Sequence, residues 1–330
     1  MKLEVLQHCP IVIRDFLTYS ETIKGKSSRS VEGYHLDLQT FFRYILMVRG
    51  MTDSKIPFEQ IDIAPVNIEL IKTITLSDLY AYLVYCKNER DNNAATRARK
   101  TSTLKIFFKF LCEQTHQLEA NPTLMLDSPK VKQSLPKHLT LEDSLELLNS
   151  VDGANQKRDY CILTIFLNCG LRLAELCSLN VGDIKADGTM TVTGKGNKER
   201  LVYLNDACRE AIRDYLSVRP NENLPYPHSN ALFISRNHRR ISPKTVQYIV
   251  KTHLQKAGLG DQGFSTHKLR HTAATLMYQH GQVHIRVLKD ILGHSNLGTT
   301  QIYTHDSNTQ IKNAVDSNPL SKVNNKKTSD

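Results

Sequence analysis

The stretch LGHSNLGTTQIYTH, residues 292–305, places two histidines and one tyrosine around a run of small, turn-prone residues. His294 follows a glycine, Tyr303 comes nine residues later, and His305 lies two residues beyond the tyrosine. Such a stretch fits a metal site, the packed end of a helix, or a tyrosine nucleophile with a histidine to steady the developing charge. The other polar groups of the chain decide between these uses.

Two upstream stretches hold single charges in apolar surroundings. In NCGLRLAEL (168–176), Arg172 follows a glycine break and Glu175 comes three residues later, so both side chains can share one helix face. An isolated pair of this kind is more often structural than catalytic. In TMTVTGKGNKERLVYL (189–204), alternating threonine and valine before a Gly/Asn-rich turn predict a β-hairpin with Lys195 at or near its tip.

The stretch HKLRH (267–271) allows two interpretations. His267 and Arg270 are three residues apart and share one face of a predicted helix. His267 and His271 have the i, i+4 spacing of zinc ligands, but no glutamate follows the first histidine, and Arg270 between them would repel a cation. A zinc site is therefore the weaker interpretation.

Six side chains from these stretches suit phosphodiester chemistry if the fold brings them together. Two guanidinium groups can hold the non-bridging oxygens and stabilise a pentacoordinate transition state. A tyrosine can form a covalent phosphotyrosine and a lysine can protonate the leaving oxygen, so that no metal ion is needed. The six are Arg172, Lys195, His267, Arg270, His294 and Tyr303.

Composition indicates a globular chain of two domains. A single core rarely exceeds about 250–300 residues, and this chain has 330, of which 40% are hydrophobic and 23% charged. No apolar run approaches the ~20 residues of a membrane span, and the N-terminus lacks a signal-peptide core. The seven cysteines are odd in number and never spaced CxxC, so we expect a reducing cytoplasm and no disulfide framework. Together with the lack of an apolar span, this predicts a cytoplasmic protein with no membrane partner.

Charge is unevenly divided along the chain. Residues 1–127 have 16 Lys and Arg against 15 Asp and Glu, whereas residues 128–330 have 27 against 18, a net charge of +9. A basic domain of this size suits a polyanion such as nucleic acid. Composition alone allows a solubilising surface charge equally well.

Four segments are predicted: a helical domain over 1–127, a linker rich in proline and lysine over 128–139, a second domain over 140–318, and a disordered polar tail over 319–330. Cap residues predict helix starts at Ser77, Thr140, Ser242 and Thr266. Apolar spacing in the second domain predicts helices over 141–151, 158–180 with a break at Gly170, 241–258, 265–281 and 283–293.

The first domain is expected to hold helices over 30–48, 76–89 and 92–114, with residues 50–75 irregular. Helix 92–114 is basic in its first half and rich in phenylalanine in its second half. It could therefore dock through the phenylalanines and offer its cations to phosphates, although a solvated helix face is the commoner role of such charges. The candidate DNA-binding cations are Arg97, Arg99, Lys100 and Lys105.

The order and spacing of four stretches resemble the catalytic domain of the tyrosine recombinases, the phage integrase family, and most closely its Xer-type branch. The stretches are GLRLAEL (170–176), TGKGNKERLVYL (193–204), HKLRHTAAT (267–275) and LGHSNLGTTQIYTH (292–305). The resemblance covers roughly residues 138–318 and extends more loosely to the first domain. It implies a mainly α-helical fold with a small β-hairpin or sheet, in which a helical, SAM-like core-binding domain precedes a mixed α/β catalytic domain.

The resemblance also implies roles for the six residues. Tyr303 would attack the scissile phosphate, Lys195 would act as general acid on the leaving 5′-oxygen, and His267 would assist proton transfer or position the phosphate. The side chains that would hold and neutralise the phosphate are Arg172, Arg270 and His294. Glu175 would support the first of these arginines, whereas His305 belongs to the motif without needing to touch the phosphate.

Two features depart from the family pattern. Residues 50–75 look like an insertion relative to the compact first domain of the Xer-type proteins, so DNA contacts there cannot be transferred. Tyr203 stands after the hairpin, where the family often has proline, which affects the turn and not the chemistry.

The activity implied by the resemblance is site-specific DNA recombination. Two transesterifications per strand pass through a 3′-phosphotyrosine, so that neither ATP nor a cofactor is required. The implied partners are double-stranded DNA and further recombinase subunits, in a homo- or hetero-tetramer on two DNA sites. The biological role would be resolution of chromosome dimers or integration and excision of a mobile element.

Three other functions stay open at this level. A type IB topoisomerase uses similar residues but does not exchange partners. A DNA-binding protein that has lost catalysis is disfavoured because all six catalytic positions are filled. A zinc hydrolase built on the histidines is the third.

Overall fold

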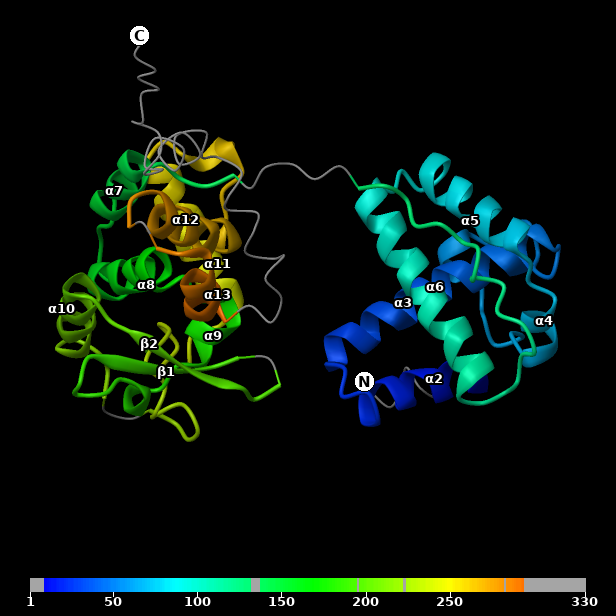
Figure 1. The fold of residues 1–330 in the computed structure, drawn as a ribbon, viewed down its shortest axis with the longest axis horizontal. Coiled ribbons are helices and arrows are strands. Elements are labelled where there is room, and N and C mark those ends of the chain that lie inside the picture. The colour runs from blue at the N-terminus through cyan, green and yellow to red at the C-terminus, as the bar shows by residue number, and fades with distance from the viewer. Residues whose placement is uncertain (1–8, 132–136, 195, 222–223, 282, 294–330) are drawn as a thin grey trace, which may run out of the picture. The chain divides into compact units, whose positions relative to one another are not determined.

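The structure is a computed structural model that describes residues 9–131, 137–194, 196–221, 224–281 and 283–293 (Figure 1). The chain divides into two compact units, Met1–Gln133 and Ser134–Asp330, each of which is considered by itself. Within the described ranges, no helix combines the length and the apolar character needed to cross a membrane.

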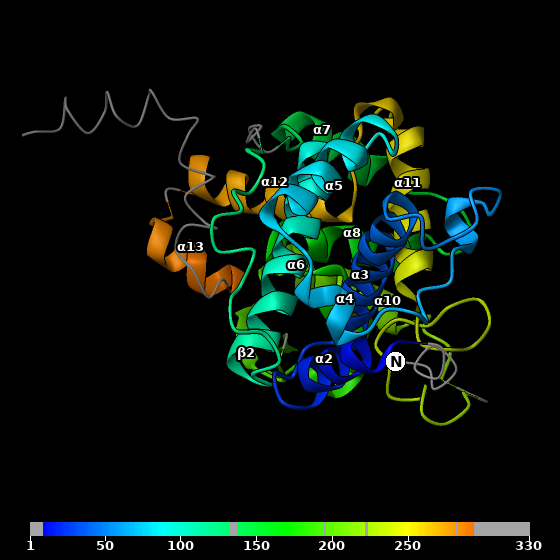
Figure 2. The ribbon, with the colours of Figure 1, turned by 90° about the vertical axis from the view of Figure 1, so that its right-hand side faces the viewer.

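The first unit is built from α2 (Ile11–Thr22), α3 (Ser28–Val48), a 3-10 turn η1 (Phe58–Gln60), α4 (Ile68–Lys72), α5 (Leu76–Asn88) and α6 (Ala94–Glu113). Helix α3 packs against α2, α5 and α6 (Figure 2). Their shared core contains several aromatic contacts: Phe41 meets Tyr82 edge-on at 5.0 Å between ring centroids, and Phe42 meets Phe107 at 5.9 Å. The predicted helices over 30–48 and 92–114 are confirmed.

Residues 50–75 belong to the core of the first unit. They contain η1 and α4 between irregular stretches. Five of their apolar side chains are at most 5% exposed and join the same core, namely Ile61, Ile63, Val66, Ile71 and Ile74. Burial of five isoleucine and valine side chains contributes substantially to stability, so this segment helps to stabilise the first unit.

The second unit contains α7 (Leu141–Asn149), α8 (Gln156–Cys169), α9 (Leu173–Ser178), η2 (Val181–Asp183), strands β1 (Thr189–Thr193) and β2 (Glu199–Tyr203), α10 (Asp206–Leu216), α11 (Pro243–Lys256), η3 (Gly260–Gln262), α12 (Thr266–Gln279) and α13 (Ile285–Leu292). Helix α8 packs against α7, α10 and α12 and is buried along most of its length (Figure 1). The predicted fold class, mainly helical with a small β-hairpin, is confirmed.

Several predicted helix ends are confirmed and two are wrong. Thr140 opens α7 through a capping box with Asp143, as predicted. Helix α5 is capped by Thr75 and not by Ser77, because Thr75 accepts from the backbone N–H of Asp78 and the Asp78 carboxylate accepts in return. Helix α12 has Ser265, in extended backbone, as its N-cap in place of the predicted Thr266.

Candidate active site around Glu175

The candidate site is built where two helices end. Helix α8 stops at Gly170 with a left-handed φ of +59°, and α13 stops at Gly293 with φ of +63°. A β-carbon on Gly170 would lie 2.9 Å from Leu292 Cδ2. Glycine at this break therefore permits both the left-handed turn and the close packing of the α13 end against it.

Arg172 and Glu175 open helix α9 and are bonded to one another. The Arg172 backbone N–H donates to Glu175 Oε2 at 2.8 Å, and Arg172 Nη1 donates to Glu175 Oε1 at 2.7 Å. Arg172 Nη2 also donates to the Gly293 carbonyl at 3.3 Å. The Arg172 side chain is 42% exposed whereas that of Glu175 is 3% exposed, so the buried carboxylate holds a guanidinium that can still reach a ligand.

Arg270 ties the two helix ends together from α12. Its side chain is 3% exposed; Nη1 donates to the Gly170 carbonyl at 2.6 Å and Nη2 to the Leu292 carbonyl at 2.7 Å. Nη1 also lies 3.9 Å from Glu175 Oε2. A buried guanidinium is costly unless it is paired and hydrogen-bonded. Arg270 donates to two carbonyls and lies near a carboxylate, which offsets this cost.

Arg200, on strand β2, is a third arginine of this cluster and was not predicted. Nη1 and Nη2 donate to the two Glu175 oxygens, each at 2.9 Å, and Nε donates to the Ile291 carbonyl at 3.3 Å. This bidentate geometry is the strongest form of an arginine–carboxylate pair. The sequence carried no local signal for it, because the two partners are 25 residues apart.

Glu175 is ionised in the folded protein. Burial alone would raise its pKa, but the hydrogen bonds from Arg200 and from the Arg172 backbone and side chain outweigh burial and lower the pKa to about 2. One carboxylate against three guanidinium groups leaves the cluster with a surplus of positive charge. Such a cluster attracts an anion to its one exposed arginine, Arg172.

His267 lies one turn before Arg270 on α12 and is exposed. Partial desolvation, followed by the charges of Arg270, Lys268 and Arg172, lowers the pKa of His267. Its Nε2 lies 3.0 Å from Nε2 of His271, with the two rings nearly perpendicular. Among the described residues, no group of three or more His, Cys, Asp or Glu is arranged to hold a metal ion.

Four predicted residues, Lys195, His294, Tyr303 and His305, lie outside the described residues. The chain neighbours of two of them, Lys195 and His294, border the Glu175 cluster. A β-carbon on Gly194 would lie 3.6 Å from Glu175 Oε1, and one on Gly293 would lie 3.0 Å from Arg200 Cδ. The chain therefore passes the cluster one residue before Lys195 and again one residue before His294.

The candidate DNA-binding helix α6 is fixed to α3 through Asp37, whose side chain is 1% exposed. Arg99 pairs with Asp37, Lys100 Nζ lies 3.3 Å from Asp37 Oδ1, and Thr103 donates to Asp37 Oδ2 at 2.8 Å. Lys100 is buried, so in this conformation it pairs inside the protein and does not face a ligand.

The other cations of α6 reach the surface to different degrees. The Arg99 side chain is 54% exposed, and those of Arg97 and Lys105 are partly exposed. Arg97 donates to the Asn92 carbonyl next to the start of the helix. Three of the four predicted cations are thus accessible on α6.

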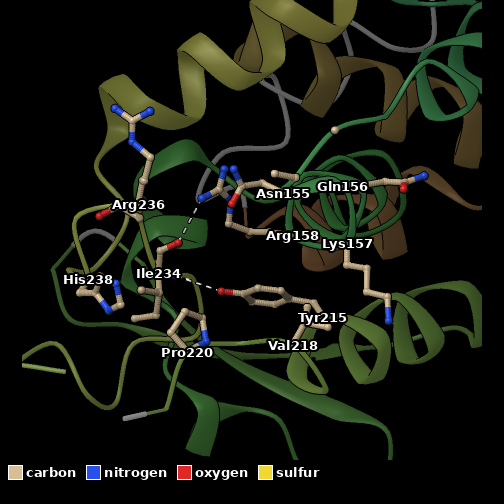
Figure 3. Close-up of a pocket in the computed structure, with 13 residues that line it drawn as sticks. Asn155, Gln156, Lys157, Arg158, Tyr215, Val218, Pro220, Ile234, Arg236 and His238 are labelled. Carbon is tan, nitrogen blue, oxygen red and sulfur yellow. Dashed lines mark hydrogen bonds between the residues drawn. The ribbon is translucent and has the colours of Figure 1, made fainter. Parts of the chain in front are cut away.

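A separate cavity of about 470 Å³ opens at the start of α8 (Figure 3). Two of its polar side chains are engaged within the protein: Arg158 Nη1 donates to the Ile234 carbonyl at 3.3 Å, and the Ile234 backbone N–H donates to the Tyr215 hydroxyl at 3.0 Å. Arg158 also pairs with Asp159. None of the described catalytic candidates lines this cavity, so the Glu175 cluster remains the candidate site.

Comparison with known proteins agrees with the geometry. The sequence pattern of the phage integrase family matches residues 137–310, and that of the phage integrase N-terminal SAM-like domain matches residues 60–115. The tyrosine recombinase XerC of Caldanaerobacter subterraneus subsp. tengcongensis is 50% identical over 319 residues, which cover 97% of this chain and 89% of that protein.

Two further matches extend over most of the chain. The tyrosine recombinase XerC of Thermodesulfovibrio yellowstonii is 33% identical over 317 residues, which cover 94% of this chain and 97% of that protein. The crystal structure of XerH site-specific recombinase bound to palindromic difH substrate, a post-cleavage complex, has the same fold, with a TM-score of 0.68, 22% identity and 95% of each chain covered. The chain therefore belongs to the phage integrase family and is a site-specific tyrosine recombinase.

Proposed function

We propose that Tyr303 is the nucleophile of this recombinase and that the Glu175 cluster receives the scissile phosphate. The observation that carries this proposal is the convergence of Arg172, Arg200 and Arg270 on one buried carboxylate, with Arg172 exposed. In this proposal Arg172 and Arg270 stabilise the phosphate, the former by direct contact and the latter by fixing both helix ends.

The chemistry consists of two transesterifications. The Tyr303 oxygen forms a bond to phosphorus while the bond to the 5′-oxygen breaks, and the resulting 3′-phosphotyrosine is later attacked by a 5′-hydroxyl. The Arg172 guanidinium, aimed at the non-bridging oxygens, stabilises the charge of the transition state, and such stabilisation is usually the largest catalytic contribution. In the proposal, His294 also holds the phosphate.

Proton transfer is assigned to two other residues. Lys195 donates a proton to the leaving 5′-oxygen, since the hairpin that carries it borders the cluster at Gly194. His267 is the candidate acceptor of the tyrosine proton. Its lowered pKa favours the neutral imidazole near pH 7, and only the neutral ring can accept a proton.

The domain assignment belongs to the same proposal. Residues 1–127 would form the core-binding domain, 128–139 the linker, and 140–318 the catalytic domain. Arg97, Arg99 and Lys105 are the proposed phosphate contacts of the first domain, while Lys100 supports Asp37. We propose that the protein works on double-stranded DNA in the cytoplasm, at the nucleoid, as a tetramer of one or two kinds of recombinase.

Two roles for the recombination reaction are compatible with the relatives named tyrosine recombinase XerC. One is the resolution of chromosome dimers, and the other is integration or excision of a mobile element. The DNA sequence attached to the tyrosine distinguishes them, because the first role predicts one chromosomal site and the second predicts the ends of an element.

Capture of the covalent intermediate tests the proposal. Wild type and Tyr303→Phe are incubated with sheared DNA from the source organism, denatured in detergent, and the attached DNA is sequenced. We expect an adduct at one defined sequence with wild type and none with the variant, because the variant lacks the nucleophilic oxygen.

The other outcomes are equally informative. Adducts spread evenly over the DNA would indicate a topoisomerase-like cleavage without a target site. An adduct that persists in Tyr303→Phe would mean that another residue is the nucleophile. A folded, DNA-binding wild type that never forms an adduct, even with a supercoiled substrate, would contradict the proposed activity.

A further inference from the structure

We propose that Arg200 is a positioning residue for strand cleavage: it holds the β-hairpin that carries Lys195 against Glu175, so that the lysine can reach the leaving 5′-oxygen. The inference rests on the proposed function, because it takes Lys195 as the general acid. It concerns a residue outside the six catalytic candidates.

Arg200 lies within the hairpin, close to its turn. It lies on β2 opposite Val192 of β1, and the turn between the strands contains Lys195. The turn is closed by a 2.7 Å hydrogen bond from the Gly194 N–H to the Lys198 carbonyl. A contact made by Arg200 therefore acts on the base of the turn, five residues from the lysine.

Arg200 connects the hairpin to Glu175 and to the end of α13. Its Nη1 and Nη2 donate to the two oxygens of Glu175, and its Nε donates to the Ile291 carbonyl near the end of α13. A β-carbon on Gly194 would lie 3.6 Å from Glu175 Oε1 and 3.9 Å from Arg200 Nη1. The hairpin backbone thus rests directly on the Arg200–Glu175 pair, immediately before Lys195.

The three arginines around Glu175 belong to different elements. Arg172 and Arg270 come from α9 and α12 and keep Glu175 paired without help from the hairpin. Of the three, Arg200 alone belongs to the hairpin. Strands β1 and β2 remain paired without it, and Val192 and Val202 remain in the core. Its loss should therefore free the hairpin tip while leaving Arg172 and Arg270 in place.

A substrate that needs no general acid isolates this role. In a 5′-bridging phosphorothiolate, sulfur replaces the leaving oxygen at the scissile bond. The attack by Tyr303 then breaks a phosphorus–sulfur bond and releases a thiolate. Because a thiol has a pKa of about 8.5, the thiolate is a stable leaving group and needs no proton from a general acid. Misplacement of Lys195 consequently slows cleavage of the oxygen substrate but not of the sulfur substrate.

The experiment compares the rate of covalent adduct formation on both substrates, built on the target sequence, for wild type, Arg200→Met, Lys195→Ala and Arg172→Ala. A misplaced general acid typically costs about 10²–10⁴-fold. We expect Arg200→Met and Lys195→Ala to lose about 10²-fold or more on the oxygen substrate and to return to within about tenfold of wild type on the sulfur substrate. Arg172→Ala should remain slow on both, because phosphate binding does not depend on the leaving atom.

Two further variants keep the test decisive. Arg213→Met removes an exposed α10 arginine, whose side chain is 75% exposed, and should cleave both substrates as wild type does. If Arg200→Met fails to fold, Arg200→Lys replaces it. This variant keeps the charge but cannot take both Glu175 oxygens, so we expect a smaller loss that sulfur also reverses.

The outcomes separate this inference from the proposed function. Cleavage of the oxygen substrate by Arg200→Met at the wild-type rate overturns the positioning role. So does an equal loss on both substrates, which would assign Arg200 to phosphate binding or to folding. If sulfur fails to rescue Lys195→Ala, the general-acid assignment falls and this inference falls with it. If sulfur rescues Lys195→Ala but not Arg200→Met, only this inference falls.

Discussion

At the scale of single residues, Glu175 sets the charge balance of the candidate site. Its side chain is 3% exposed and accepts hydrogen bonds from Arg172 and Arg200, with Arg270 3.9 Å away. A buried carboxylate of this kind is stable only while its partners stay paired with it. The arginines are therefore held in a fixed arrangement without a ligand, which would reduce the reorganisation needed for the proposed phosphate binding.

The low pKa of Glu175 makes a prediction about acid stability. The pKa is about 2 in the folded protein against an ordinary value of 4.5, so the unfolded chain takes up the proton first as the pH falls. The stabilisation is complete above about pH 5 and is lost as the pH falls toward 2, about 3 kcal/mol in all. Urea unfolding followed by circular dichroism should therefore show a flatter dependence on pH for Glu175→Gln than for wild type.

A matched variant checks this prediction. Glu210→Gln removes a carboxylate that is 68% exposed and lies 3.7 Å from Arg213 in the same unit. An exposed pair contributes at most about 1 kcal/mol, so this variant should follow the wild-type pH dependence. Parallel curves for Glu175→Gln and wild type would mean that the Glu175 carboxylate is not held as an ion among the arginines.

The cluster also shows which residues a sequence can indicate. The sequence predicts the contact between Arg172 and Glu175, because side chains three residues apart lie on the same face of a helix. The role of Arg200 could not be predicted because its partner lies 25 residues away in the sequence. The same holds for Asp37, which contacts Lys100 across 63 residues. Contacts of this kind depend on the packing of elements, which a local pattern does not contain.

At the scale of elements, the site lies where α8 and α13 end. Both helices finish in a left-handed glycine, and Arg270 donates to a carbonyl at each end. Unpaired carbonyls at a helix end carry partial negative charge and favour a cation there. One buried arginine thus satisfies two helix ends and fixes their spacing.

Gly170 gives the prediction that belongs to this scale. Gly170→Ala should cost about 1 kcal/mol for the left-handed backbone and about 1–3 kcal/mol more because its β-carbon would press on Leu292. Leu292 is fully buried beside Ala274 and Leu288, so it has little room to move. The free energy of unfolding in urea measures the loss.

Gly258 supplies the comparison for Gly170. It has a similar φ of +71°, but a β-carbon there would meet nothing within 4 Å. Gly258→Ala should therefore show only the cost of the backbone conformation. Equal losses in the two variants would mean that the end of α13 does not pack tightly on the α8–α9 turn.

Helices were largely predictable from the sequence because their signals are local. Apolar spacing and end residues located α3, α6, α7 and α11, and alternation located the β1–β2 hairpin. The caps at Ser77 and Thr266 were misplaced by two residues and one residue, since neighbouring threonine and serine can each cap a helix. Helix α10 was not predicted, because its short amphipathic pattern directly follows the hairpin.

At the scale of the whole molecule, the two units differ in charge more than in construction. Each has its own hydrophobic core, which is richer in aromatic side chains in the first unit than in the second. Residues 1–127 are nearly neutral, whereas residues 128–330 carry a net charge of +9. Since nonspecific affinity for DNA follows the number of phosphates neutralised, this asymmetry predicts unequal contributions to binding.

Separate expression of residues 1–127 and 128–330 tests that division. Each fragment contains a complete core and should unfold cooperatively on its own, which circular dichroism establishes first. On duplex DNA without a target site, we expect residues 128–330 to bind with a steep loss of affinity as salt rises, at a slope of about −0.9 for each phosphate contact. Residues 1–127 should bind weakly and with a shallow slope, because their surface cations are offset by nearby acids. If residues 1–127 bound as tightly and as steeply as residues 128–330, the local cations of α6 would outweigh net charge, and the first unit would be the main source of affinity.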